Sequence, residues 1–333
     1  MTEVLPKLAS FTRLSDRVWR VLGLNPGKFT LQGTNTYLIG KGERKILLDC
    51  GEGIPEYTPL LEESLKSISS NAYISDIIIS HGHQDHFGGL SSIFSNPFFQ
   101  KHDIKVHRYF APPITNGNTT ENDDDDEVGG YSHLKYFPAD ISVQALQDQQ
   151  LFKIEESTTL RVIHTPGHTR DHCTFWLEEE QSLFTADCVL GSGTAVFQDL
   201  STYLEGLKKL LLLEPKKLYP GHGDVVEDGN KKINEYIDHR LLREKQILDL
   251  LSSSSGDSEG QFGQYSCMDI VQVLYKNYPT NLHLPAAHGV LLHLLKLKKD
   301  GKVKLVQPLA NNDHFTLNSV NASDVLSKKW HRL

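Results

Sequence analysis

The sequence has little of what secreted and membrane proteins need. Its 333 residues include only four cysteines, and none of them shows paired spacing. A disulfide framework is therefore not expected, and a reducing compartment is the default. The longest apolar runs fall far short of the ~20 residues that span a bilayer, so we expect no membrane insertion. The first 20 residues lack the apolar core of a signal peptide, which argues against secretion.

The N-terminal segment leaves two compartments open. Arg13, Arg17 and Arg20, with few acidic residues around them, resemble a mitochondrial presequence. The segment Val18-Trp19-Arg20-Val21-Leu22, however, has the pattern of the first strand of a fold. We therefore expect the mitochondrial matrix or the cytoplasm. The sequence does not indicate an oligomeric state.

Charge is unevenly distributed along the chain. Residues 260–333 hold nine Lys/Arg and four Asp/Glu, a net charge of +5, so that residues 1–259 carry −13 of the total of −8. Glu121 and the run Asp123 to Glu127 supply six of these negative charges. This run lies among Asn, Thr and Gly residues, which predicts an acidic disordered insertion at about 113–131.

The most informative segment is His81-Gly82-His83-Gln84-Asp85-His86, which follows the apolar run Ile77-Ile78-Ile79. It places four potential metal ligands within six residues. Imidazole nitrogens and a carboxylate suit zinc and similar divalent ions. The alternative is a surface histidine cluster without a ligand, but a loop dense in donors directly after a buried strand favours a metal site.

Further donors lie later in the chain, each in a tight turn after a predicted strand. Taken singly, a His beside Gly is a common turn residue, and an Asp after a strand is a common cap. Together and in this order they form a specific pattern. The three positions are His168 after Thr165-Pro166-Gly167, Asp187 after the strand 182–186, and His222 within Pro220-Gly221-His222-Gly223.

The order HxHxDH, distant His, Asp and His resembles the metallo-β-lactamase superfamily. Further segments resemble its β-lactamase-like protein 2 branch, within the glyoxalase II-like group, over about residues 14–306 except for residues 111–135. These segments are Asn25-Pro26-Gly27, Thr30 to Leu38, Thr165 to Thr169, Gly193 to Phe197 and Tyr219 to Gly223. The resemblance implies an endoribonuclease acting on single-stranded RNA. Fungal thioesterases that act on acyl carrier proteins share many of the same sequence segments, so an acyl thioester is an alternative substrate.

The ligand set predicts a centre with two zinc ions per chain. We expect His81, His83 and His168 to bind one ion and Asp85, His86 and His222 the other, with Asp187 between them. A metal-bound hydroxide would be the nucleophile, and Asp85 would also act as a catalytic residue that orients or deprotonates it. The reaction class is hydrolysis, with single-stranded RNA as the expected substrate and an acyl thioester as the alternative. A non-catalytic RNA-binding protein is disfavoured because the ligand set is complete.

Three further positions carry open alternatives. Asp49 follows the apolar Ile46-Leu47-Leu48 and either accepts from a ligand histidine or caps a strand. Asn35 either contacts substrate or shapes the turn of Gly33-Thr34-Asn35-Thr36. His164 is either an extra proton donor near the site or an edge-strand residue.

Periodicity predicts an α/β protein in the form of an αβ/βα sandwich over residues 1–251. A Ser/Gly-rich linker follows at 252–262, then a small winged-helix-like domain at 263–308 and a tail of uncertain structure at 309–333. Within the small domain, Ser266 and Asp269 predict a capped helix over 266–278, followed by a helix over 283–298 and a strand over 303–306. Elsewhere strands are expected at 17–23, 35–40, 44–49, 75–80, 104–108, 159–164, 173–178, 182–186 and 216–219, and helices at 57–68, 86–95, 200–213 and 230–252.

Overall fold

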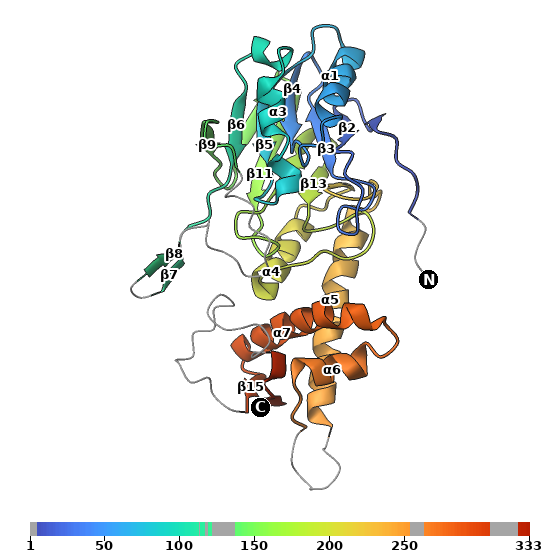
Figure 1. The fold of residues 1–333 in the computed structure, drawn as a ribbon, viewed down its shortest axis with the longest axis vertical. Coiled ribbons are helices and arrows are strands. Elements are labelled where there is room, and N and C mark those ends of the chain that lie inside the picture. The colour runs from blue at the N-terminus through green and yellow to red at the C-terminus, as the bar shows by residue number, and fades with distance from the viewer. Residues whose placement is uncertain (1–4, 113, 117–118, 122–136, 254–262, 307–325) are drawn as a thin grey trace. The chain divides into compact units, whose positions relative to one another are not determined.

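The computed structural model describes residues 5–112, 114–116, 119–121, 137–253, 263–306 and 326–333 (Figure 1). The chain divides into two compact units, one of residues 1–197 with 202–234 and the other of residues 198–201 with 235–333. The division falls inside a long helix, earlier than the boundary at residue 251 that the sequence favours. Most of the proposed linker, from residue 254 to residue 262, lies outside the described residues.

Two large sheets form the framework of the larger unit. The first has the order β1 (Phe11–Arg13), β2 (Val18–Leu22), β3 (Asn35–Ile39), β4 (Arg44–Leu48), β5 (Tyr73–Ile79), β6 (Lys105–Arg108) and β9 (Val143–Ala145). Its strands are antiparallel from β1 to β4 and parallel from β4 to β9. The second has the order β10 (Leu151–Ile154), β11 (Thr158–His164), β12 (Cys173–Leu177), β13 (Ser182–Ala186) and β14 (Lys217–Pro220). Only its pair β13–β14 is parallel.

The helices of this unit and the helix that leads out of it follow the predicted order. They are α1 (Tyr57–Ile68), α2 (Gln84–Phe87), α3 (Leu90–Ser95), α4 (Leu200–Leu211) and α5 (Gly229–Ser252), with short 3-10 turns η1 (Phe99–Lys101) and η4 (Glu178–Glu180). All strands expected from the sequence in this unit are present. The short strands β1, β9 and β10 were not predicted, because three or four residues give too little alternation to be recognised.

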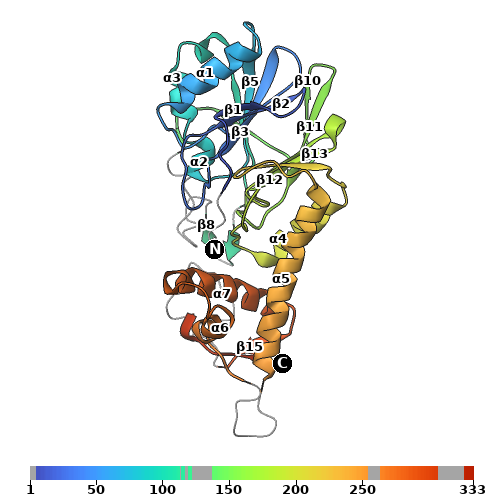
Figure 2. The same cartoon turned by 90° about the vertical axis from the view of Figure 1, so that its right-hand side faces the viewer.

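Strand β5 shows why the chain forms layers. Successive side chains of a strand point to opposite faces of the sheet. Ile77 and Ile79 accordingly join a core with α1 and α3, while Ile78 joins a second core between the two sheets. A strand that is apolar on both faces must be covered on both, and this requirement produces the order helices, sheet, sheet. Figure 2 shows α1 and α3 on one side of the first sheet and β10, β11 and β13 on the other.

One expected helix is interrupted. The prediction of a single helix over 86–95 was wrong, because α2 ends at Phe87 and α3 begins at Leu90. The chain passes too close to the preceding loop for a side chain at this point. A Cβ on Gly89 would lie 1.9 Å from the carbonyl oxygen of Cys50, and one on Gly88 would lie 2.4 Å from that of Glu52. The two glycines therefore allow the chain between α2 and α3 to lie directly against the loop that follows β4.

The smaller unit contains α6 (Cys267–Leu274), η5 (Thr280–Leu282), α7 (His283–Lys299), β15 (Val303–Leu305) and β16 (Trp330–Arg332). The predicted cap is confirmed, since Ser266 and Asp269 form a reciprocal capping box at the start of α6. Buried Leu294 and Trp330 belong to one apolar core that includes residues of α5, α6 and α7. An ion pair joins the half-buried Lys296 of α7 to the buried Glu244 of α5, with 2.9 Å between nitrogen and oxygen.

The end of the chain has a definite structure. Within the tail predicted to be uncertain, residues 326–333 are described, and β16 pairs antiparallel with β15. The proposed disordered insertion at 113–131 lies largely outside the described residues. Its described parts correct the prediction locally, because Ile114–Asn116 (β7) and Thr119–Glu121 (β8) form an antiparallel pair. Among the described residues, no helix combines the length and the apolar character needed to cross a bilayer.

Candidate metal centre

Three histidines from the two sheets converge at one point. His81 and His83 follow β5 of the first sheet, and His168 follows β11 of the second. The Nε2 atom of His168 lies 3.2 Å from Nε2 of His81 and 3.1 Å from Nδ1 of His83, and the latter two atoms are 2.9 Å apart. All three rings therefore direct one nitrogen to a common centre, as the sequence pattern predicts for the first ion.

A second group forms beside the first. Asp85 and His86 lie on α2, and His222 follows β14. The Oδ2 atom of Asp85 is 3.3 Å from Nε2 of His86 and 3.3 Å from Nε2 of His222. His86 is fully buried and His222 is nearly so. This is the donor set that the sequence predicts for the second ion.

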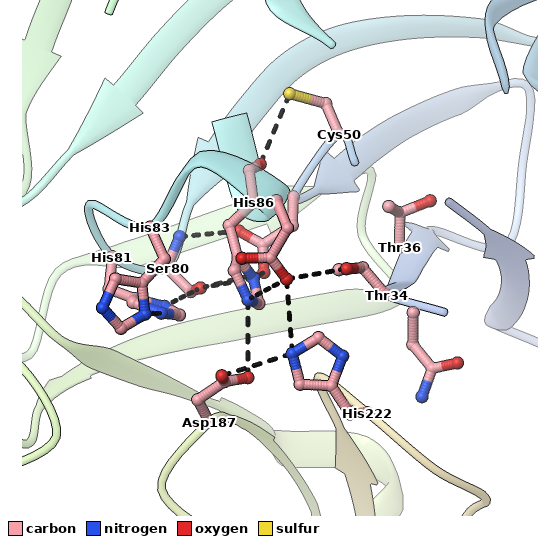
Figure 3. A network of polar contacts seen from close by, with 12 residues as sticks. Thr34, Thr36, Cys50, Ser80, His81, His83, His86, Asp187 and His222 are labelled. Carbon is pink, nitrogen blue, oxygen red and sulfur yellow. Dashed lines mark hydrogen bonds and ion pairs between the residues drawn. The ribbon is translucent and has the colours of Figure 1, made fainter. Parts of the chain in front are cut away.

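Asp187 lies between the two groups (Figure 3). Its Oδ1 atom is 3.4 Å from Nε2 of His86, while its Oδ2 atom is 3.3 Å from Nε2 of His222 and 3.7 Å from Nε2 of His168. One carboxylate therefore faces donors of both groups, which is the position expected of a bridging ligand. Cys188, which follows Asp187, belongs to neither donor group of the described residues.

The donor atoms fit divalent metal ions. Nitrogen and oxygen donors at ~2.0–2.1 Å from a tetrahedral zinc ion lie about 3.3 Å from one another. Most separations within the two groups are close to this value. Moreover, Nε2 of His86 and Oδ1 of Asp187 are buried and make no hydrogen bond within the described part of the chain. Buried polar atoms without partners are costly, and a cation between them would satisfy both.

Asp49 orients a histidine in each group. Its Oδ2 atom accepts hydrogen bonds from Nδ1 of His86 at 2.7 Å and from the Ser80 hydroxyl at 2.8 Å. Because the Ser80 hydroxyl donates to Asp49, it accepts the bond from Nδ1 of His81 at 3.0 Å. Both Nδ1 atoms therefore carry a proton, which leaves the Nε2 atoms as the ones that can bind a metal ion at the centre. Of the two alternatives for Asp49, the structure shows the hydrogen bond to a histidine of the donor groups, His86.

The loop that carries His168 is fixed in a similar way. Nδ1 of His168 donates to the carbonyl of Val196 at 2.8 Å, so its Nε2 atom also presents a lone pair. Gly167 makes the approach of α4 possible, because a Cβ there would lie 2.5 Å from the backbone of Tyr203. Its φ of +132° also disfavours any other residue.

Electrostatics divide the histidines into two kinds. Burial, reinforced by neighbouring histidines, holds the pKa of His81 far below its usual value, and burial lowers that of His83 to about 3. Burial also disfavours the charged form of His222, but Asp187 and Asp85 outweigh it and raise its pKa to about 9. In the metal-free protein the first group is thus neutral and ready to bind metal, whereas the second group holds protons that metal binding must displace.

The two proposed substrate-binding residues are engaged with the protein. Asn35 is 1% exposed, and its amide donates to the carbonyls of Pro220 at 2.8 Å and Gly223 at 2.7 Å. These bonds hold the loop that carries His222, so they belong neither to a substrate contact nor to the turn at residues 33–36. The Nε2 atom of His164 lies 2.9 Å from the carbonyl of Arg170, and its ring stacks on Tyr109 with centroids 3.9 Å apart. A role of either side chain in substrate binding stays a prediction.

Sequence reasoning missed several supporting residues. His172 accepts a hydrogen bond at Nε2 from the backbone of Asp187 at 3.3 Å, and its Nδ1 donates to the Thr165 hydroxyl at 3.0 Å. Ser80 relays Asp49 to His81, and Thr34 donates to Asp85 at 2.8 Å. The signal available for them was their position, since each lies within a few residues of a ligand or inside a quoted motif.

Comparison with known proteins assigns the class. Residues 29–222 match the model of the metallo-beta-lactamase superfamily, and residues 266–307 match that of the beta-lactamase associated winged helix domain. The chain therefore belongs to the metallo-beta-lactamase superfamily. Both the expected two-sheet fold and the expected winged helix are confirmed. Membership identifies the chain as a hydrolase by class, with a His/Asp cluster able to hold metal.

Individual relatives are similar over nearly the whole chain. The Beta-lactamase-like protein 2 homolog of Drosophila melanogaster is 40% identical over 299 residues, covering 90% of this chain and 93% of the relative. The homolog of Caenorhabditis elegans is 38% identical over 304 residues, covering 91% of this chain and 89% of the relative. The Atrochrysone carboxyl ACP thioesterase nsrC of Aspergillus novofumigatus is 38% identical over 260 residues, covering 78% and 70%.

A solved structure supports the fold. A beta-lactamase domain protein from Burkholderia ambifaria superposes with a TM-score of 0.72 at 17% identity, over 100% of this chain and 96% of that chain. A metallo-beta-lactamase family protein from Thermus thermophilus superposes with a TM-score of 0.63 at 19% identity, over 96% of this chain and 100% of that chain. At this level of identity the likeness speaks for the fold alone.

Proposed function

We propose that this protein is a hydrolase with two zinc ions that cleaves single-stranded RNA. The observation that carries the hydrolytic centre is the convergence of seven donors in two groups that share Asp187. The choice of RNA as substrate has two grounds. The chain is similar to beta-lactamase-like protein 2 homologs, and the match to the Drosophila melanogaster homolog covers 93% of that protein's length. The sequence resemblance to this branch implies ribonuclease activity.

The chain's own residues have distinct tasks in this proposal. His81, His83 and His168 would hold one ion, Asp85, His86 and His222 the other, and Asp187 both. When bound, the ions supply an activated water as nucleophile and positive charge that stabilises the transition state. Asp85 has one oxygen, Oδ1, without a hydrogen bond among the described residues, and this oxygen would accept the proton of the attacking water.

The smaller unit offers a second contribution to RNA binding. Lys299, Lys302 and Lys304 are exposed at the end of α7, in the turn that follows it and on β15, respectively. Lysines at such positions suit contacts with phosphates, which favour binding without selecting a sequence. We therefore expect RNA affinity, more than the rate of cleavage, to depend on them and on salt.

A thioesterase is the second candidate, and a specific observation favours it. The relative nsrC is named an Atrochrysone carboxyl ACP thioesterase, and at 38% it is nearly as identical to this chain as the beta-lactamase-like protein 2 homologs are, at 38–40%. The same arrangement of donors would serve, because an activated water can attack a thioester carbon as well as a phosphorus. The two candidates therefore differ in substrate contacts and not in the metal centre.

The deciding experiment offers both substrates to the same protein. Purified protein is incubated with labelled single-stranded RNA and with a generic acyl thioester, with and without chelator, beside the variants Asp85→Ala and Asp103→Ala. Asp103 is an exposed acid outside the site and serves as the matched control. We expect RNA cleavage that chelator and Asp85→Ala abolish, that added Zn²⁺ restores, and that Asp103→Ala leaves unchanged. Thioester turnover with intact RNA would replace the first candidate by the second, and inertness toward both in protein with two bound ions would remove both.

The compartment belongs to the proposal as well. We propose the mitochondrial matrix or the cytoplasm: Arg13, Arg17 and Arg20 favour the first, and the strand pattern of residues 18–22 favours the second. Arg20 lies in β2, is 3% exposed and donates to Asp224 at 2.9 Å. A presequence cleaved beyond this point would remove a strand of the first sheet. If the protein enters mitochondria by this segment, we therefore expect the segment to be retained, which N-terminal sequencing of the imported protein would show.

A further inference from the structure

Asn25 and Thr34, which both precede β3 in the chain, form a hydrogen-bonded path to the carboxylate of Asp85, the proposed catalytic residue. The Thr34 hydroxyl contacts Oδ2 of Asp85 at 2.8 Å, a bond that appears as the dashed line from Thr34 in Figure 3. Behind it, Nδ2 of Asn25 lies 3.0 Å from the Thr34 hydroxyl. Thr34 is fully buried and Asn25 is 8% exposed. These contacts belong to the Asn-Pro-Gly and Gly-Thr-Asn-Thr segments, which no ligand or chemical step has so far explained.

The direction of this path is fixed by its partners. The backbone N–H of Thr34, which can only donate, points to Oδ1 of Asn25 at 2.8 Å. The other end of the amide must therefore be the NH₂ group, and it donates to the Thr34 hydroxyl and to Glu52 at 3.0 Å each. The Thr34 oxygen thus accepts from Asn25, and its own proton is left for Asp85.

The loop is built to hold this amide. A Cβ on Gly33 would lie 3.3 Å from Oδ1 of Asn25, and Gly33 has a φ of +124°. The carbonyl of Asn25 accepts from the Thr30 hydroxyl at 2.6 Å. The carbonyl of Thr34 accepts from the backbone of Gly23 at 2.7 Å. A side chain held from several directions keeps its geometry when the carboxylate beyond it gains or loses a partner.

The bond from Thr34 distinguishes the two oxygens of Asp85. It ends on Oδ2, the oxygen that also lies 3.3 Å from the Nε2 atoms of His86 and His222. A carboxylate oxygen has about two lone-pair directions, so one remains for an ion and Oδ1 stays without a hydrogen bond among the described residues.

We infer that Asn25 and Thr34 are positioning residues for catalysis. They hold Asp85 so that Oδ2 alone serves as the ligand atom, and they keep Oδ1 available to accept the proton of the nucleophile. This inference rests on the proposed function, since it takes Asp85 as both ligand and proton acceptor. It assigns a task to two residues that belong to neither donor group.

The first test measures metal binding without any substrate. Thr34→Val keeps the shape of the side chain but removes the donor, Thr34→Ser keeps the donor, and Thr36→Val is the matched control. Thr36 lies in the same strand, and its buried hydroxyl bonds to Val21 and Tyr57 and not to the site. By competition of a chromogenic chelator for Zn²⁺, we expect Thr34→Val to weaken binding about 10- to 100-fold. Thr34→Ser and Thr36→Val should stay near the wild type.

The second test separates positioning from general damage. With the substrate that the wild type turns over, Thr34→Val should lower kcat about 10- to 100-fold at saturating Zn²⁺ and leave KM within a few-fold. Asn25→Asp should do the same, because a carboxylate cannot donate and the Thr34 hydroxyl would turn towards it. If Thr34→Val does not fold, Asn25→Asp with the same two measurements decides.

Two outcomes overturn the inference. In one, Thr34→Val binds Zn²⁺ and reacts like the wild type; in the other, Thr34→Ser is as impaired as Thr34→Val, which would assign the effect to packing. The variant Asp85→Ala separates this failure from that of the proposed function. If Asp85→Ala loses Zn²⁺ affinity and activity while the Thr34 and Asn25 variants lose neither, only the positioning role is wrong. If Asp85→Ala loses neither, the proposed centre itself is wrong.

Discussion

Asp49 accepts a hydrogen bond from Nδ1 of His86 at 2.7 Å, and the same carboxylate reaches His81 through the hydroxyl of Ser80. His86 and His81 belong to different donor groups. One carboxylate at the end of β4 thus sets the tautomer of one ligand in each group. The two prospective metal positions are therefore coupled through a residue that binds neither ion.

The first prediction concerns this coupling. Every partner of the Asp49 carboxylate is a donor, including the backbone of Ser80, whereas an amide accepts at only one of its two ends. We expect Asp49→Asn to lower Zn²⁺ affinity at both positions by about 10- to 100-fold. Chelator competition and the metal content after dialysis measure this, with Asp103→Asn as control. Loss of one ion only would show that Asp49 supports a single position and does not couple the two.

The second prediction concerns protons. In the metal-free protein, Asp187 and Asp85 raise the pKa of His222 to about 9, and carboxylates raise that of His86 as well. Zn²⁺ binds the neutral rings, so binding near neutral pH should release protons. The release should fall as the pH rises through about 9, where the affinity should level off. Calorimetry in buffers of different ionisation enthalpy measures the number released, and binding with no proton release near neutral pH would contradict the prediction.

The third prediction concerns pH and stability at a site away from the metals. Burial alone would raise the pKa of Asp76, but hydrogen bonds from His107, Ser75 and Arg44 outweigh it and lower the pKa from 3.8 to about 2. A carboxyl group whose pKa is lower in the folded than in the unfolded state stabilises the fold at pH values above its unfolded-state pKa. That stability is lost as the pH falls through the folded-state pKa.

The loss of the Asp76 contribution at low pH can be measured with a variant that lacks the charge. We expect Asp76→Asn to cost about 2 kcal/mol in free energy of unfolding near neutral pH, and the difference from the wild type to shrink between pH 3.8 and about 2. Urea denaturation at several pH values tests it, with Asp103→Asn as a surface control. A difference that stays constant down to pH 3 or so would assign the effect to shape instead of charge.

The fourth prediction concerns the last strand. Trp330 of β16 is fully buried in the core that contains Leu294 and Leu297 of α7. Truncating a buried tryptophan typically costs about 3–5 kcal/mol, so Trp330→Ala should lower the unfolding midpoint of the smaller unit. His331→Ala, at a half-buried neighbouring position, should have much less effect. Equal effects of the two variants in urea denaturation would show that β16 adds little to this core.

The sequence alone determined the sandwich and the seven donors. Strands such as 75–80 and 182–186 are continuous apolar runs that end at Gly, Pro or a ligand-bearing turn, so their position is a local property. The spacing of His81, His83, Asp85 and His86 is likewise local, and the family resemblance supplied the distant partners. For these features, neighbours along the chain carry the information.

The tertiary structure decided what depends on contacts between distant segments. The interruption at Gly88 and Gly89 follows from the close passage of the chain near Cys50, and β16 exists as a strand because β15 lies beside it. The tautomers of His81 and His86, and the donor direction of Thr34, follow from bonds across up to about fifty residues of sequence. Hydrogen-bond direction and close approach depend on distances of a few ångströms in space, and a linear pattern of residue types does not contain those distances.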